Sequence, residues 1–377
     1  MVGSDERTKR ILIENKAMIK HSHEVINPPL SLQQMGGITV TQLGHFGGFI
    51  NRIKDGQEVD LFRFITREIT AATMHSFYGP NNPFALDPEL IEAFWDWEWE
   101  IVAYMTGVLP SIFARKAKSG LERCVKGFEK YAEAGGYRDA RSLVQNRKLM
   151  HEEAGITPHE HARLELGLCF GFNSNASITT FWVLNNIFSR PELLAELREE
   201  IEKERPCHTR YDLLPQVEGF LSASQFYLQR DHEDHVAHDI RSHGGIIHKD
   251  ASIWGPDVSC FNPRRFQYNW HGSKADDNGN MSNAKADQVH AAAFRGFGGG
   301  ASLCPGRHVA QMEVLSLTAA MVCAFDVLPP QGKSEVNWDP PRDDKRFPFS
   351  TLKPLRELRV QLKRRVGMEN THWTLQA

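Results

Sequence analysis

Most of the chain has the hydrophobic spacing of α-helices. Apolar positions recur three and four residues apart in residues 5–25, 39–52, 59–77, 111–133 and 137–154, with turn-forming clusters between them. Residues 88–104 are rich in aromatic side chains, which we interpret as core packing. Alternation typical of a strand is confined to residues 358–362 near the end of the chain. The pattern predicts a mainly α-helical protein.

The best-defined helix is predicted over residues 157–188. Thr157, Pro158 and Glu160 form a helix-start signature, with a capping side chain and proline at the first helical position. A helix of this length measures about 48 Å at about 1.5 Å per residue and must cross the core of its domain. Its middle, residues 172–176, carries three polar residues, Asn173, Ser174 and Asn175, between apolar runs. Either the local backbone satisfies these amides, or they form a kink that faces oxygen or a substrate.

A glycine-rich loop at residues 297–307 contains one cysteine, Cys304, and a helical pattern follows at once. Glycines let backbone amides approach a sulfur atom, and Pro305 suits the first turn of a helix. A thiol before a helix N-terminus is favoured as the thiolate by the helix dipole. The loop therefore indicates a thiolate presented to a metal. The alternative is a buried structural cysteine in a turn.

The arrangement F-x-x-G-x-x-x-C-x-G, which matches Phe297, Gly300, Cys304 and Gly306, resembles the haem-binding loop of the cytochrome P450 family. The resemblance implies haem b with its iron bound by the Cys304 thiolate. It also implies that Phe297 shields the sulfur and that both glycines allow close amide approach. The expected fold is a cytochrome P450-like helical fold with small β-sheets.

The resemblance covers part of the family's fold. It begins partway in, so the fold is expected to be incomplete at the N-terminus. We expect one domain with a helical part at 1–204, an atypical polar stretch at 205–245, and a haem-loop part at 246–377. The family's Glu-x-x-Arg helix has no match at 206–245, although Arg265 fits the arginine that completes its ion-pair network. There, His232, His235 and His238 are more typical of a solvated loop than of a metal site.

The middle of the predicted long helix suggests which residues stand over the oxygen site. Most P450s have an acid followed by a threonine there, and alignment on Phe181 and Trp182 places Asn175 and Ala176 at these positions. The asparagine looks like that of the branch including sterol 7α-hydroxylases and prostacyclin synthase. An amide can orient water but cannot shuttle a proton as a carboxylate does. Both residues are therefore candidate catalytic positions.

The haem propionates need cations. Many family members have arginine or histidine two residues before the cysteine, where this chain has Ser302. Arg307 and His308 are the nearest cations, and Arg307 is the better candidate for paired hydrogen bonds to a carboxylate.

Composition limits the partners. The chain has 377 residues and a net charge of −3, so it lacks the basic field expected of a nucleic-acid-binding protein. Its six cysteines are scattered, which favours free thiols over disulfides. No apolar run is long enough for a transmembrane helix. We expect a protein on the cytoplasmic side, or associated with the endoplasmic reticulum without a visible anchor.

The resemblance implies an oxidoreductase of secondary metabolism, a P450 monooxygenase. It would oxidise a hydrophobic sterol, lipid, terpenoid or polyketide with O₂ and electrons from NADPH-cytochrome P450 reductase. Two alternatives stay open. The chain could be a haem-thiolate isomerase or dehydratase without external electrons, because Asn175 and Ala176 depart from the usual pair. It could also be a non-catalytic remnant, because family segments are missing.

Overall fold

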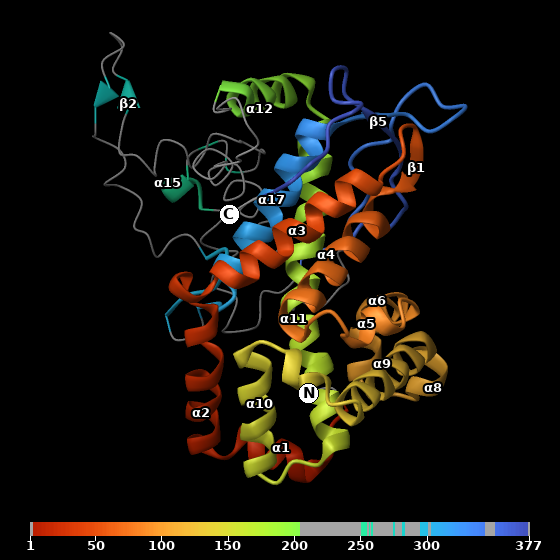
Figure 1. The fold of residues 1–377 in the computed structure, drawn as a ribbon. Helices are drawn as coiled ribbons and strands as arrows, with labels where there is room; N and C mark the ends of the chain where they lie inside the picture. Colours follow the sequence, from red (N-terminus) through yellow and green to blue (C-terminus); the bar gives the residue numbers. More distant parts are fainter. Residues whose placement is uncertain are drawn as a thin grey trace.

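One long helix, α11 (Pro158–Phe188), runs through the middle of the molecule, and other helices pack around it (Figure 1). The computed structural model describes residues 3–203, 250–254, 256, 258, 274–275, 281–282, 295–300, 303–343 and 351–375. Before α11 come α1 (Glu6–Ile13), α2 (Lys16–Ile26), α3 (Gly36–Arg52), α4 (Leu61–Tyr78), α5 (Pro83–Leu86), α6 (Glu89–Trp99), α7 (Ile101–Met105), α8 (Pro110–Phe113), α9 (Arg115–Glu133) and α10 (Ser142–Glu153). After it come α12 (Pro191–Lys203), α15 (Ala251–Trp254) and α17 (Arg307–Ala324).

The strands are short and antiparallel. β5 (Arg359–Arg364) lies between β1 (Gln57–Asp60) and β4 (Phe325–Leu328), with Val59 opposite Val360 and Val327 opposite Leu362. A second pair joins β2 (Lys274–Ala275) to β3 (Met281–Ser282). β5 confirms the strand predicted near the end of the chain. The prediction of a mainly helical protein with small sheets is likewise confirmed.

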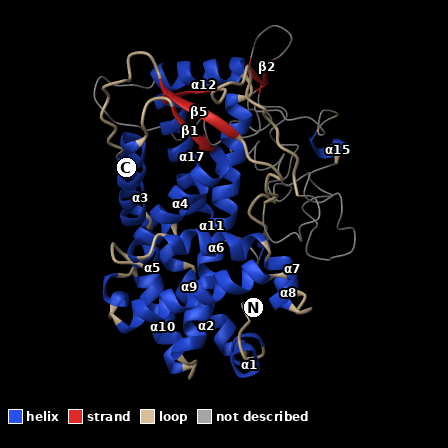
Figure 2. Cartoon of the chain, turned by 90° about the vertical axis from the view of Figure 1, so that its right-hand side faces the viewer, coloured by secondary structure: helices blue, strands red, loops and turns tan. Residues whose placement is uncertain are grey.

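Two hydrophobic cores line the two halves of α11. The C-terminal half packs with α3, α4, α17 and the three-stranded sheet, around residues such as Phe181 and Trp182. The N-terminal half packs with α6 and α9, around Phe94, Phe128 and Leu166. Figure 2 shows the same division, with the sheet above and α6, α9 and α10 below. The aromatic stretch at 88–104 supplies this second core, as predicted, although Trp99 is exposed.

The predicted start of α11 is confirmed, but only half of the capping box forms. Thr157 Oγ1 accepts a hydrogen bond of 3.3 Å from the backbone N–H of Glu160. The Glu160 carboxylate instead accepts from the backbone N–H of Asp5, at 3.1 Å. The α-helix is continuous through its polar middle, and Asn173 Nδ2 donates to the carbonyl of Cys169 at 2.9 Å. The local backbone therefore satisfies the NH₂ group of Asn173, whereas its buried Oδ1 has no hydrogen-bond partner among the described residues.

Several predicted helix boundaries were wrong, and two of them have a clear physical reason. The stretch 5–25 is two helices, because the Asn15 side chain accepts from the N–H groups of Ala17 and Met18 and starts α2 afresh. The helix predicted from residue 59 begins at Leu61, since the preceding residues pair with β5 as β1. Both errors come from interactions that compete with helical spacing.

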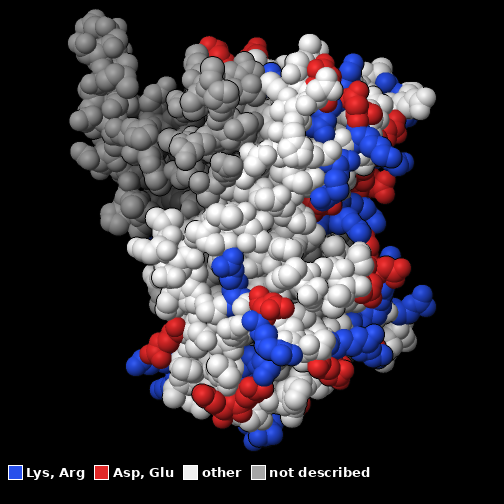
Figure 3. Space-filling view, in the orientation of Figure 1, with Lys and Arg blue, Asp and Glu red and all other residues white. Residues whose placement is uncertain are grey.

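Within the described residues, no helix is long and apolar enough to cross a membrane. Figure 3 shows basic and acidic side chains interspersed on one face of the molecule. The polar stretch 205–245, with His232, His235 and His238, lies outside the described residues, as do Arg265 and Ser302.

Candidate functional site

The cysteine loop is held in shape by its own backbone. The N–H of Cys304 donates to the carbonyl of Phe297 at 2.8 Å, and the N–H of Leu303 donates to that of Gly300 at 3.3 Å. Gly298 and Gly300 have φ angles of +74° and +58°, a region that side-chain-bearing residues rarely adopt. The two glycines therefore allow the chain to turn sharply and deliver Cys304 to the start of α17.

The Cys304 sulfur is half-buried and receives a hydrogen bond from the backbone N–H of Gly306. A β-carbon built on Gly306 would lie 3.9 Å from Sγ, an ordinary contact distance. An amide donor at the sulfur stabilises negative charge on it.

Burial nevertheless raises the pKa of the Cys304 thiol, against the lowering effects of the Gly306 N–H and Arg307. For the thiol without a bound metal, desolvation therefore outweighs the local hydrogen-bond donor and the nearby positive charge. A metal ion bound at Cys304 would supply this stabilisation, since coordination deprotonates a thiol.

Arg307 braces the loop from the first turn of α17. Its Nη1 donates to the carbonyl of Cys304 at 3.2 Å, and its side chain is half-buried. A guanidinium has five N–H donors, so this one bond leaves further donors for a carboxylate. His308 beside it is also half-buried, and burial lowers its pKa.

On α11, an open strip interrupts an otherwise buried helix. Between residues 173 and 188, Asn175 alone is exposed, and Gly171 is exposed one turn earlier on the same face. A side chain added to Gly171 would meet nothing within 4 Å. Ala176, the other candidate catalytic residue, is buried at 4% exposure, and its carbonyl accepts from Thr180 Oγ1 at 2.8 Å. The open strip thus presents Asn175 and not Ala176.

The Asn175 amide has a fixed orientation. Its Oδ1 accepts a hydrogen bond of 2.8 Å from the backbone N–H of Thr351, and the Thr351 hydroxyl lies 3.4 Å from the same oxygen. A backbone N–H can only donate, so the amide oxygen must face Thr351. The Asn175 NH₂ group therefore faces away from Thr351 as a hydrogen-bond donor.

These features fit a haem bound through cysteine. The chain offers one half-buried sulfur with an amide donor, in the loop before α17. α17 packs against α11, which carries the open strip. A single cysteine thiolate is the protein ligand of the iron in haem-thiolate proteins.

A second cluster of possible metal ligands, which sequence reasoning missed, lies at the other end of α11. His151, His161 and Glu165 are buried, with ligand atoms within 4.8 Å of one another. Glu165 accepts from Tyr78 at 2.6 Å and pairs with Arg147 at 3.2 Å, while the two histidine Nδ1 atoms lie 2.8 Å apart. A guanidinium on the carboxylate and a hydrogen bond between the rings make this a polar core network. The spacing of His161 and Glu165, four residues apart on one helix, was its only sequence signal.

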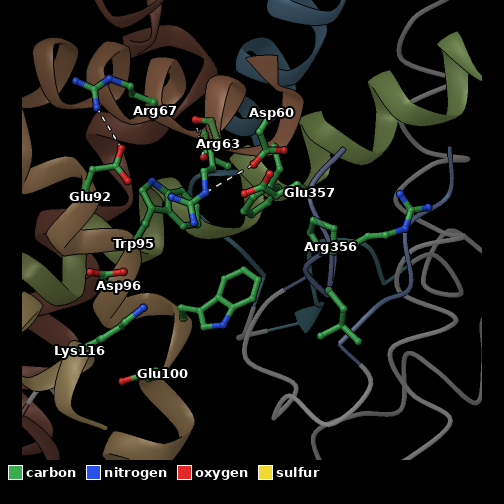
Figure 4. Close-up of a pocket in the computed structure, with 15 residues that line it drawn as sticks. Asp60, Arg63, Arg67, Glu92, Trp95, Asp96, Glu100, Lys116, Arg356 and Glu357 are labelled. Carbon is green, nitrogen blue, oxygen red and sulfur yellow. Dashed lines mark hydrogen bonds and ion pairs between the residues drawn. The ribbon is translucent and has the colours of Figure 1, made fainter. Parts of the chain in front are cut away.

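A pocket of about 330 Å³ opens between α4, α6 and the segment 354–357 (Figure 4). Its rim is charged: Arg67 pairs with Glu92 at 3.1 Å, and Arg63 lies 3.7 Å from Asp60. None of the predicted site residues lines it. Its 354–357 wall closely follows Thr351 and Leu352, which contact α11.

Comparison with known proteins supports the resemblance that the cysteine loop indicates. The family model of cytochrome P450 matches residues 240–351, which include Cys304. The chain is 28% identical over 345 residues to the cytochrome P450 monooxygenase nodJ of Hypoxylon pulicicidum, covering 83% of this chain and 65% of that protein. It is 24% identical over 409 residues to a cytochrome P450 monooxygenase of Gibberella zeae, covering 99% of this chain and 76% of the relative.

A more distant match is the steroid 17-alpha-hydroxylase/17,20 lyase of Squalus acanthias, 26% identical over 258 residues, with 61% of this chain and 45% of that protein aligned. The chain therefore spans less than two thirds of nodJ and about three quarters of the Gibberella relative. The cysteine loop, the mainly helical fold and these matches together show that the chain is similar to cytochrome P450 proteins.

Proposed function

We propose that this chain is one P450-like domain that acts as a haem-thiolate monooxygenase on a hydrophobic small molecule. The observation that carries the proposal is the geometry of Cys304. Its sulfur is half-buried, receives the Gly306 N–H, and stands before α17 on a loop tied to the Phe297 carbonyl. Such a loop suits a permanently bound metal better than a structural thiol, since the other described cysteines are buried.

Haem b bound at Cys304 would supply the iron chemistry that activates O₂. The chain's own residues would do the rest. The Gly306 N–H and Arg307 would stabilise charge on the sulfur, and Phe297 would cover it. Arg307 would also donate to a propionate. On the opposite side, the Asn175 NH₂ would donate a hydrogen bond into the site.

The substrate class follows from the walls of the open strip and from the relatives. The partly buried Leu168 and Phe172 flank the strip with apolar surface, which favours a sterol, lipid, terpenoid or polyketide. Relatives named cytochrome P450 monooxygenases support secondary metabolism and electrons from an NADPH-cytochrome P450 reductase. Association with the cytoplasmic face of the endoplasmic reticulum would bring that reductase close. Asn175 and the Phe181-Trp182 pair support the sterol 7α-hydroxylase and prostacyclin synthase branch.

Measurement of substrate turnover tests this proposal. The full chain, loaded with haem, is incubated with a panel of hydrophobic substrates, O₂, reductase and NADPH. Product should need all three and should disappear in Cys304→Ala. The matched control is Cys323→Ala, which removes a buried thiol from α17, the helix that follows Cys304, and should keep turnover. Product formation by Cys304→Ala would overturn the proposal.

A second function is favoured by one observation. Asn175 and Ala176 replace the acid and the alcohol, and the Asn175 oxygen is already bound to Thr351. A site with a donor but no proton-shuttling carboxyl group suits an isomerase or dehydratase that rearranges an oxygenated substrate. Turnover of such a substrate without O₂ or reductase would establish it in place of the monooxygenase.

A further inference from the structure

Asn175 belongs to a larger contact region between α11 and the segment 351–353. Trp182 Nε1 donates to the carbonyl of Leu352 at 2.7 Å, two turns along α11 from the Asn175–Thr351 contact. Between them, Thr179 Oγ1 lies 3.5 Å from Thr351 Oγ1. The segment is therefore attached to the face of α11 that carries Asn175.

The end of this segment contains a buried ion pair. Lys353 is 1% exposed and pairs through Nζ with Glu98 of α6, which is fully buried. The Lys353 Nζ also lies over the ring of Trp99, 4.4 Å from its centroid. The other Glu98 oxygen accepts a hydrogen bond of 2.8 Å from Ser174, the residue before Asn175.

Such a pair is costly to bury and needs a reason. Two desolvated charges gain little net stability over apolar residues of the same volume, but removing one partner leaves the other uncompensated. What the pair does achieve here is geometric. It joins α6, the central helix and the C-terminal segment at one point, two residues from Thr351 and one residue from Asn175.

We propose that the Lys353–Glu98 pair is a positioning device: it holds the Thr351 N–H on Asn175 and so fixes Asn175 as a hydrogen-bond donor to an acceptor oxygen on the ligand. The ligand so recognised is a hydrophobic molecule bearing a carbonyl or hydroxyl oxygen. Only this naming of the ligand rests on the proposed function. The positioning itself depends on contacts within the chain.

Amide hydrogen exchange of the full chain tests the positioning without haem. The double variant Lys353→Met/Glu98→Gln removes both charges, and the glutamine side chain retains an oxygen that accepts the hydrogen bond from Ser174. Exchange at Thr351 should accelerate by about tenfold or more, while the buried 178–188 part of α11 stays protected.

The matched control removes a buried ion pair at the far end of α11, between Arg147 of α10 and Glu165 of α11. Arg147→Met/Glu165→Gln should leave exchange at Thr351 unchanged. Equal acceleration in both double variants would show a global effect and refute the positioning role. Unchanged exchange at Thr351 in Lys353→Met/Glu98→Gln would also refute it.

The donor is tested in the haem-loaded chain with carbon monoxide as the probe. Asn175→Leu removes a hydrogen-bond donor near the bound carbon monoxide, so the C–O stretching frequency should rise. In Lys353→Met/Glu98→Gln the donor is present but less fixed, so the C–O stretching band should broaden. An unchanged band in Asn175→Leu would overturn the donor assignment. Failure of the wild-type chain to take up haem would instead contradict the proposed function, and the exchange result would still decide the positioning role.

Discussion

The hydroxyl of Thr73 on α4 donates a hydrogen bond of 2.6 Å to Oε1 of Glu313 on α17, although the two residues are 240 positions apart in the chain. Gln42 of α3 donates to the same oxygen. Glu313 is 1% exposed, and burial raises its pKa to about 7. Three helices around the C-terminal half of α11 thus meet at one carboxyl group that the fold holds protonated at mild acidity.

This carboxyl group makes stability depend on pH. Between the ordinary value of 4.5 and about 7, the unfolded chain is ionised at Glu313 while the folded chain stays protonated. Its contribution is therefore fully present below pH 4.5 and is lost as pH rises to about 7, a change of about 3 kcal/mol. Glu313→Gln removes this loss and keeps both hydrogen bonds.

Chemical denaturation from pH 5 to pH 8 measures the difference. Glu313→Gln should gain stability relative to the wild type as pH rises, and the gain should level off above pH 7. Glu335→Gln, an exposed position near the end of β4, should show no such trend. A pH-independent difference for Glu313→Gln would mean that the buried carboxyl group is not the cause.

Buried His151 has the opposite effect on the pH dependence of stability, because it destabilises the folded chain as pH falls. Burial, with help from Arg147 and His161, lowers the pKa of His151 to about 2. Below pH 6.5, His151 is protonated in the unfolded chain but stays neutral in the folded chain. The contribution of His151 to the free energy of unfolding is therefore fully present above pH 6.5 and is lower by about 2 kcal/mol at pH 5. His151→Gln should flatten the loss of unfolding free energy between pH 6.5 and pH 5. His23→Gln, exposed on α2, should have the wild-type slope, and an equally steep slope in His151→Gln would disprove the assignment.

Arg364 is a structural residue in a run that looks like a solvated basic end. Its Nη2 donates to the carbonyls of Ile50 and Ile53 at 2.7 and 3.1 Å, and its guanidinium lies 4.6 Å from the ring centroid of Phe325. Arg364→Met should cost about 2 kcal/mol of unfolding free energy, because two carbonyls lose a charged donor. Thermal or urea unfolding measures this, with exposed Lys363→Met as the matched control. Equal stability of the two variants would show that Arg364 contributes nothing.

The sequence predicts what depends on local signals. The start of α11 follows from Thr157 and Pro158, which act within one turn. The chain direction change at the cysteine loop follows from glycines at positions with positive φ. The strand β5 follows from alternating residues that fill one face of the sheet.

What it cannot predict depends on partners far away in the chain. β1 has no strong strand pattern of its own and exists because β5, about 300 positions later, pairs with it. The pairing of Lys353 with Glu98 and of Thr351 with Asn175 likewise needs the fold before it can be seen. The motif at Asn175 predicted a residue of interest, but only the packed segment shows which end of its amide is available.

The most direct test of the account is the reduced carbon monoxide difference spectrum of the haem-loaded full chain. We predict the strongly red-shifted Soret band of thiolate ligation in the wild type and in Cys323→Ala, and its loss in Cys304→Ala. A wild-type chain that binds haem but gives the shorter-wavelength band of non-thiolate haem, or a Cys304→Ala variant that keeps the red-shifted band, would contradict the assignment of Cys304 as the iron ligand.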